Sequence, residues 1–165
     1  MSQTARRLAE LGIALPKPAA PVANYVPAIR TSGSMAAGVL PQLWISGQLP
    51  LGSDGALAER HKGKLGPDSG VDAAREAARL CAINLLAQAQ AALGDLDKIV
   101  QTVRLGGFFN VAGAFDPLPQ AMNGASDLMV EVLGERGKHA RTTVGVAHLP
   151  LNALAEVEAV FLVSF

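Results

Sequence analysis

The sequence predicts an α+β domain in which a mixed sheet carries two helices on one of its faces. Three observations lead to this fold class: two long segments have helical periodicity, these segments follow different expected strands, and a further pair of strands is expected at each end of the chain. The expected order is β-β-α-β-α-β-β, with one small extra helix in front. A length of 165 residues fits a single domain.

Residues 1–24 are expected to precede the domain proper, which we place at residues 25–165. Ser2 to Leu11 has the pattern of a short amphipathic helix, and Gly12 can end it. Prolines then stand at positions 16, 18, 21 and 27. Because proline has no backbone N–H and restricts the residue before it, this stretch is expected to be an extended connector.

The two long helices are expected at Val71 to Leu93 and at about Gln120 to Leu133. Apolar residues recur at helical spacing in both, namely Ala77, Leu80, Ile83, Ala87 and Ala91 in the first, and Met122, Leu128, Met129 and Val132 in the second. Ser69 and Asp72 are the candidate N-caps of the first helix, and Gly94 suits its C-terminal end.

Five strands are expected around these helices. Their ranges are Ala28 to Met35, Gln42 to Gln48, Asp97 to Asn110, His139 to Pro150 and Ala155 to Val160. In the third strand, Ile99, Val103 and Leu105 are expected to alternate with Thr102 and Arg104. The last two strands are expected to pair with each other around a Pro/Asn turn.

The segment from Glu59 to Gly70 is polar and contains three glycines and a proline, so it is expected to be an exposed loop. Its residues His61, Lys62 and Lys64 form either a small basic patch or an ordinary solvated stretch.

Composition excludes several classes of function. The 14 basic residues balance the 14 acidic ones and only 4% of residues are aromatic, so the footprint of a nucleic-acid-binding protein is missing. Cys81 is the only cysteine, which fits a reducing compartment, and its helical context predicts a small buried residue. No apolar stretch approaches the length of a membrane span, and Arg6-Arg7 is not followed by the apolar region of a signal peptide. We therefore expect a cytoplasmic protein without a membrane partner.

The two expected helices cover one face of the expected sheet and leave the other face without a cover. The sequence offers no further helix for it. Another copy of the chain is the economical solution, so an oligomer is predicted.

Four motifs resemble, in order and spacing, the RidA/YjgF family of reactive-intermediate deaminases, also called the L-PSP endoribonuclease family. They are Leu43 to Pro50 (LWISGQLP), which resembles hydrophobic-SGQ-x-P; the helix segment Leu80 to Ala92 with Asn84; Met122-Asn123-Gly124 at the second helix; and Arg141 to Val160, which resembles the ending AR-x-x-V-x-V-x-x-LP…E-x-E-A. The likeness runs from about Tyr25 to Phe165.

The resemblance implies a chorismate-mutase-like fold and a homotrimer with three clefts between subunits. Active members of the family hydrolyse enamines and imines, such as 2-aminoacrylate, to 2-keto acids and ammonia, with no metal and no organic cofactor. By the resemblance, Arg141 would bind the substrate carboxylate and Glu156 would hold the water or the ammonium end. The residues implied to line the cleft are Tyr25, Ser46, Gly47, Asn123 and Thr143.

The chain also departs from the family pattern. The loop at residues 59–70 is longer than in short members, and the front helix is an addition. Thr143 stands where a cysteine is often found, and Gly145 where an acidic residue is common. These departures indicate a longer, divergent branch.

The chemistry of the candidate residues leaves alternatives open. Arg141 presents a planar fork of donors that matches a carboxylate, or it forms a surface or interface salt bridge. Glu156 and Glu158 are two apart and so share a sheet face, where Glu156 either polarises water or belongs to a solvated, salt-bridged surface. Tyr25 either lines the cleft or only packs.

Geometry constrains the two main candidates. If Leu149 to Ala155 form the turn of the last hairpin, Ala147 lies opposite Glu156 and Arg141 lies about 20 Å away. One small substrate cannot contact both, so a site that uses both takes them from different subunits.

Other chemistries have no support in the motifs. The three histidines have no metal-ligand spacing, and no P-loop, dinucleotide fingerprint or nucleophile elbow occurs. Ser46 has no base partner in the sequence, so Ser46-Gly47-Gln48 is interpreted as backbone that approaches a ligand closely. Three functions are therefore weighed: imine and enamine hydrolysis, binding of a small carboxylate without turnover, and, against the charge balance, RNA cleavage.

Overall fold

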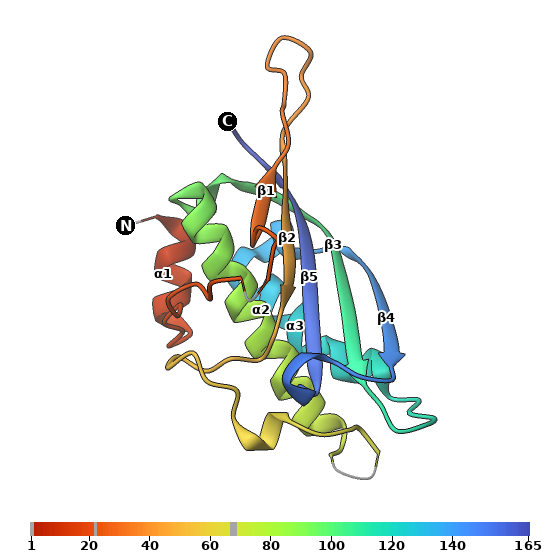
Figure 1. Ribbon diagram of the computed structural model, residues 1–165. Coiled ribbons are helices and arrows are strands. Elements are labelled where there is room, and N and C mark those ends of the chain that lie inside the picture. Colours follow the sequence, from red (N-terminus) through yellow and green to blue (C-terminus); the bar gives the residue numbers. More distant parts are fainter. Residues whose placement is uncertain (1, 22, 67–68) are drawn as a thin grey trace.

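Five strands form one sheet, and two long helices pack against one of its faces (Figure 1). The computed structural model describes residues 2–21, 23–66 and 69–165. The strands are β1 Ala28–Arg30, β2 Gln42–Gln48, β3 Ile99–Asn110, β4 Ala140–Val146 and β5 Ala155–Val163. Their order in the sheet is β1-β2-β5-β3-β4, which is the mixed sheet that the sequence predicts.

The last two strands do not form the predicted hairpin. β5 lies between β2 and β3 and is antiparallel to both, whereas β4 lies outside β3 and runs parallel to it. A parallel neighbour requires a crossover connection, and the helix between β3 and β4 supplies it. The expectation that Ala147 lies opposite Glu156 is therefore wrong, because Glu156 pairs with Phe108 of β3.

β1 is shorter than predicted. It ends at Arg30, and the chain continues into a hairpin that projects from the body at one end of the sheet (Figure 1). Ser34 and Val39 exchange backbone hydrogen bonds of 2.8 and 2.9 Å near its tip. The predicted range to Met35 thus contains a short strand and one arm of this hairpin.

The alternation predicted for β3 is broken by a register shift between Thr102 and Arg104. Thr102 is buried, and Val103 is exposed. A bulge inserts a residue and moves those beyond it to the other face, so a strict period of two does not hold here.

The two long helices match their predicted ranges closely. They are α2 Val71–Leu93 and α3 Leu118–Leu133, and the predicted apolar stripe of α3 is buried. Gly94 ends α2 in the left-handed conformation at φ +76°, as predicted. The N-cap prediction is wrong, because the N-cap is Gly70 and no side chain caps the first turn.

The small front helix is α1, Gln3–Glu10, and it packs against the domain through buried Leu8. The carboxylate of Asp97, just before β3, accepts hydrogen bonds from the backbone N–H groups of Gln3 and Thr4 at 2.7 and 2.9 Å. These donors have no partner inside the helix, so Asp97 anchors the start of α1.

The described part of the 59–70 loop is partly buried, and His61, Lys62 and Lys64 do not form a patch. His61 is buried, and its Nε2 lies 3.3 Å from Glu76 Oε1 on α2. Lys64 donates to the side chain of Asn110 and to the carbonyl of Ala147. The loop is partly buried because its backbone hydrogen-bonds to the end of β3 at Asn110 and to Leu154 just before β5.

The remaining sequence expectations concern single features. Cys81 is buried on α2, and burial raises the pKa of its thiol. None of the helices in the described ranges has the length and apolar character that crossing a bilayer would need.

Candidate functional site

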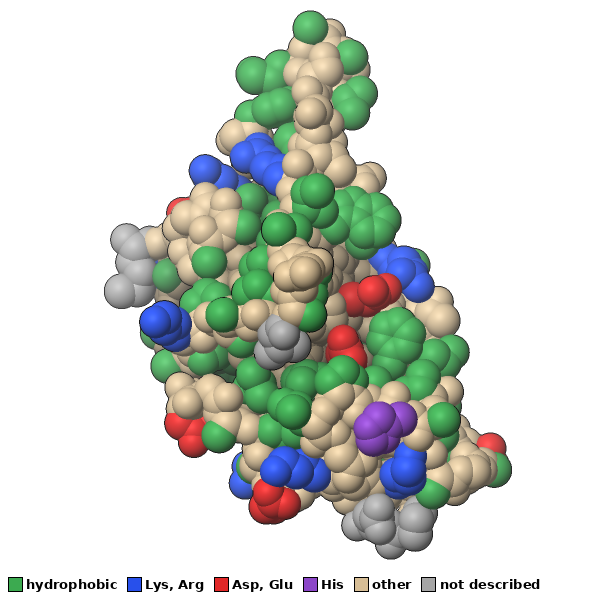
Figure 2. Space-filling view, viewed as in Figure 1, with side chains coloured by type: hydrophobic (Ala, Val, Ile, Leu, Met, Phe, Trp, Pro, Cys, Tyr) green, Lys and Arg blue, Asp and Glu red, His purple; other side chains and the backbone are tan. Residues whose placement is uncertain are grey.

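The face of the sheet opposite the helices carries the two glutamates. Glu156 and Glu158 alternate with buried Val157 on β5, which confirms that they share a face. Figure 2 shows acidic side chains set among large hydrophobic ones over the strands. The large apolar residues exposed on these strands include Ile29 at 61%, Trp44 at 48% and Val144 at 39%. None of the described residues forms a layer that covers this face.

Glu156 lies against the backbone of β2 because residue 47 is a glycine. A Cβ atom placed on Gly47 would be 1.9 Å from Glu156 Oε1, so a larger residue here would displace the carboxylate. The register of β2 on β5 shifts between Ile45 and Gln48, and this irregularity exposes the Gly47 backbone to its neighbour.

Tyr25 and Ser46 lie near the C-terminal end of β2, close to Gly47. The Ser46 hydroxyl donates to the carbonyl of Val26 at 2.8 Å, so it holds the segment before β1 in place. Tyr25 and Gly47 both line a small pocket of about 60 Å³ there. The structure thus brings Tyr25, Ser46, Gly47 and Glu156 to one region, the β2-end group.

The surroundings of Glu156 favour its protonated form. Burial raises the pKa of Glu156 above its ordinary value, and the nearby charge of Glu158 raises it further. Glu158 pairs with Arg104 at 3.1 Å, with both side chains partly exposed. A carboxyl whose pKa is raised holds its proton more readily than an ordinary glutamate, which suits a group that accepts and returns a proton.

Arg141 lies on the other face, beneath α3. It pairs with Leu105 of β3, which is buried against the helices. Its guanidinium donates to Asn123 Oδ1 at 2.9 Å, to Ser126 Oγ at 2.9 Å and to the Pro119 carbonyl at 3.0 Å. Three acceptors from one helix fix its orientation, and among the described residues it has no carboxylate partner.

Thr143 lies two residues along β4 and so on the same face as Arg141. Its hydroxyl is buried and has no hydrogen-bond partner within the described part of the chain. Arg141 and Asn123 also line a pocket of about 350 Å³. Arg141, Asn123 and Thr143 therefore form a second group, the β4–α3 group.

Two further residues, Ser126 and His139, contact this group and were not predicted from the sequence as site residues. His139 Nδ1 lies 2.6 Å from the Gly137 carbonyl, which can only accept, so this nitrogen carries the proton. His139 Nε2 then accepts from the Ser126 hydroxyl at 2.9 Å, and Ser126 Oγ accepts from Arg141. The signals were the helical spacing of Ser126 from Asn123 and the strand spacing of His139 from Arg141.

His139 is held neutral by its surroundings. Burial lowers the pKa of His139, the Gly137 carbonyl opposes this, and the charge of Arg141 lowers the pKa further. The neutral ring accepts a hydrogen bond from the Ser126 hydroxyl, which leaves the lone pairs of the serine oxygen for the Arg141 guanidinium.

The two groups do not meet within one chain. Leu105, beside Arg141, pairs with Ala159 of β5, three residues from Glu156. Arg141 and Glu156 are therefore two strands apart across the sheet and three residues apart along it, which puts their Cα atoms about 14 Å from each other. Their side chains also point to opposite faces of the sheet. The predicted 20 Å rested on the wrong hairpin register, but a single small molecule still cannot contact both residues in one chain.

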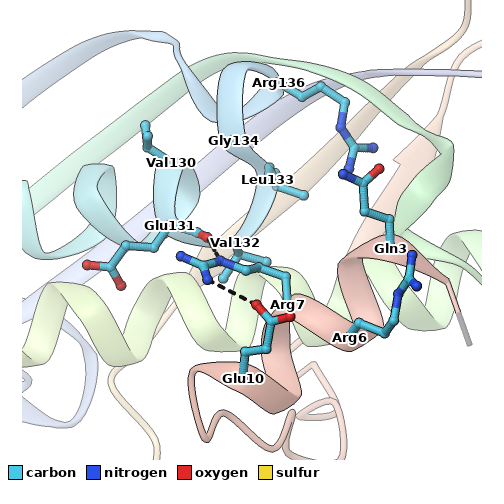
Figure 3. Close-up of a pocket in the computed structure, with 10 residues that line it drawn as sticks. All are labelled: Gln3, Arg6, Arg7, Glu10, Val130, Glu131, Val132, Leu133, Gly134 and Arg136. Atoms are coloured by element: carbon cyan, nitrogen blue, oxygen red, sulfur yellow. Dashed lines mark hydrogen bonds and ion pairs between the residues drawn. The ribbon is translucent and has the colours of Figure 1, made fainter.

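Another pocket, of about 370 Å³, lies between α1 and the end of α3 (Figure 3). Arg7 pairs with Glu10 at 3.1 Å and donates to the Glu131 carbonyl at 2.8 Å. Arg136 donates to the Ile99 carbonyl at 2.8 Å. These arginines join α1 to the domain, and none of the predicted site residues lines the pocket. Among the described residues, no three His, Cys, Asp or Glu side chains are grouped to hold a metal ion.

The comparison with family models identifies this architecture. Residues 5–163 match the model described as "YjgF/chorismate mutase-like, putative endoribonuclease". The chain belongs to the RidA/YjgF family. It is 44% identical over 158 residues to Protein TCP17 of Trypanosoma cruzi, covering 95% of this chain and 92% of that protein.

Solved members of the RidA/YjgF family share the whole fold. Protein Atu1372 of Agrobacterium tumefaciens is 42% identical with a TM-score of 0.83, over 98% of this chain and 94% of that one. A "putative endoribonuclease" of Shewanella oneidensis MR-1 is 35% identical with a TM-score of 0.88, over 98% and 100%. Both matches extend over the front helix, so the long form of the chain has close relatives.

Proposed function

We propose that this RidA/YjgF protein hydrolyses small 2-imino acids and their enamines, such as 2-aminoacrylate, to 2-keto acids and ammonia. The observation that carries the proposal is the setting of Arg141. Three of its five N–H donors bind acceptors of α3, and the other two have no partner among the described residues and are available to a ligand. A fixed guanidinium of this kind suits a carboxylate, the one permanent charge of a small 2-imino acid.

The proposed site lies between copies of the chain in a homotrimer. One copy supplies the β4–α3 group with Arg141, and its neighbour supplies the β2-end group with Glu156. The separation of the two groups within a chain supports this arrangement, as does the uncovered sheet face with Trp44 and Val144.

The reaction needs no group beyond these side chains and water. Arg141 binds the carboxylate, and the backbone near Gly47 and Thr143 orients the imine carbon. A water molecule adds to that carbon, forming a C–O bond while the C=N π pair moves to nitrogen. Glu156 takes the proton that the water loses and gives it to the nitrogen, which leaves a carbinolamine with an OH and an NH₂ group. Glu156 then takes the hydroxyl proton and gives it to the NH₂ group. The C–N bond breaks, ammonia leaves with the bonding electron pair, and an electron pair of the oxygen forms the C=O bond of the keto acid.

The test is the release of keto acid from 2-aminoacrylate generated in situ by a separate dehydratase. Arg141→Ala is expected to lower the acceleration about 100-fold or more, because positioning by the carboxylate is lost. Arg75→Ala is the matched control, since Arg75 pairs with Asp127 on an exposed helix surface at 2.7 Å. Equal rates for wild type and Arg141→Ala would contradict the proposal. Ligand binding without any acceleration would identify a binding protein instead.

A further inference from the structure

A larger pocket lies apart from both groups of the proposed site. It has a volume of about 650 Å³ and lies between the proline-rich connector, the loop after β2, α2 and the turn after β4. We call it the connector pocket. Its apolar lining residues are Pro18, Ala19, Ala20, Leu49, Leu51, Leu57 and Leu151. A volume of this size with mostly apolar walls is typical of a small-molecule site.

The walls of the connector pocket are held in place by two buried amides of α2. Asn84 Nδ2 donates to the carbonyl of Leu51 at 2.9 Å and is 3.4 Å from that of Leu49. Gln88 Nε2 donates to the carbonyl of Ala19 at 2.8 Å. The loop and the connector are thus tied to the same helix, and a preformed pocket loses little entropy when a ligand binds.

Leu151 lines this pocket with a backbone conformation that is unfavourable for leucine. Its backbone is left-handed at φ +56°, a region disfavoured for residues with a Cβ atom, and the residue is 65% exposed. The next residue, Asn152, is also left-handed, and its side chain binds Asn110. Asn152 therefore has a role in the fold, whereas the exposed apolar side chain of Leu151 has none within the described chain.

Two charged residues line the connector pocket, Lys17 and Asp54. The Asp54 carboxylate accepts the backbone N–H of Ala56 at 3.0 Å inside its own turn. Lys17 is exposed at the rim and supplies the positive charge.

We propose that the connector pocket binds a small carboxylic acid with an apolar tail, whose tail lies against Leu151 and the other apolar walls and whose carboxylate meets Lys17. This site is separate from the proposed reaction and contains neither Arg141 nor Glu156. It shares Ala19, Ala20, Leu49 and Leu51 with the small pocket beside Gly47, so a bound acid would contact a wall of the cleft.

The test is calorimetric titration of the full chain with straight-chain carboxylates from acetate to octanoate. Each added CH₂ group is expected to lower the Kd about fourfold, because burying a CH₂ contributes about 0.8 kcal/mol. Lys17→Gln is expected to weaken octanoate binding about fivefold. Lys98→Gln, in the turn before β3, is the matched control and should leave the Kd unchanged.

Leu151→Asn separates a role in binding from a role in folding. Asparagine tolerates the left-handed backbone, so the melting temperature is expected to stay the same or rise. Octanoate binding is expected to weaken, because the apolar wall is lost. Arg141→Ala should bind octanoate like the wild type. The proposal is overturned if affinity does not depend on chain length, or if Arg141→Ala abolishes binding while Lys17→Gln and Leu151→Asn do not.

Discussion

At the scale of single residues, the chemical role that we propose for Glu156 comes with a cost to stability. Its raised pKa means that the folded chain favours the protonated carboxyl. This contribution to stability is complete below the unfolded value of about 4.5 and is lost as the pH rises through the higher folded value. At neutral pH the ionised carboxylate therefore lowers the free energy of unfolding, and such a loss of stability is common at functional sites.

Glu156→Gln removes the partly buried negative charge. We expect the free energy of unfolding at pH 7 to rise by on the order of 1 kcal/mol, and the gain to disappear near pH 4. Urea unfolding between pH 4 and 8 measures it. Glu158→Gln breaks the pair with Arg104 and also removes the charge that raises the pKa of Glu156, so we expect its gain to be smaller than that of Glu156→Gln. A gain from Glu156→Gln that is the same at every pH would show that burial of charge is not its cause.

His139 is the second residue whose protonation matters. When its pKa lies below the ordinary 6.5, the ring is neutral at pH 7 and accepts the Ser126 hydroxyl. As the pH falls through this lowered pKa, Nε2 becomes a donor and the support of Arg141 changes. Keto-acid release is expected to fall at acidic pH in the wild type and to follow a flatter profile in His139→Gln. His148→Gln, an exposed histidine, should keep the wild-type profile.

At the scale of elements, the Asp97 carboxylate is one of the contacts that attach α1 to the domain. Burial tends to raise the pKa of Asp97, but hydrogen bonds from Thr4 and Gln3 and the charge of Arg136 outweigh it and lower the pKa. The stability from this ionised cap is present above the unfolded value of 3.8 and is lost as the pH falls through the lower folded value.

Asp97→Asn is expected to lower the free energy of unfolding by about 1 kcal/mol at pH 7, as for the loss of a helix cap. Thermal unfolding followed by circular dichroism measures the change. Asp72→Asn is the matched control, because Asp72 lies in the first turn of α2 without capping it. Equal losses in the two variants would contradict the anchoring role of Asp97.

The sequence predicted the ranges of the helices and strands better than it predicted which strands pair with one another. The range of β2 and that of α2 follow from local patterns of apolar residues and glycine, and both agree with the structure. The place of β5 between β2 and β3 could not be predicted, because periodicity does not specify which strands pair. In the same way, Arg141 stands out in a motif, whereas Ser126 and His139 become visible only when α3 packs on β4.

At the scale of the whole molecule, one sheet face and two separated residue groups point to an assembly. Val144→Arg places a charge on the uncovered face. We expect light scattering to show a fall from about three copies to one, with loss of keto-acid release and retained secondary structure. Ala91→Arg on α2 is the control, because Ala91 is exposed on the helix side and lies outside both groups of the proposed site. An unchanged mass for Val144→Arg would contradict the proposed role of this face.

The most direct test of a shared site is complementation between two inactive variants. Arg141→Ala and Glu156→Gln chains are unfolded together, refolded in equal amounts and assayed with 2-aminoacrylate. If Arg141 and Glu156 act from neighbouring copies, random mixing leaves about a quarter of the sites with both native residues, and about a quarter of the wild-type rate returns. If each chain carries a complete site, no mixed assembly contains a native one, and the mixture stays as inactive as its parts.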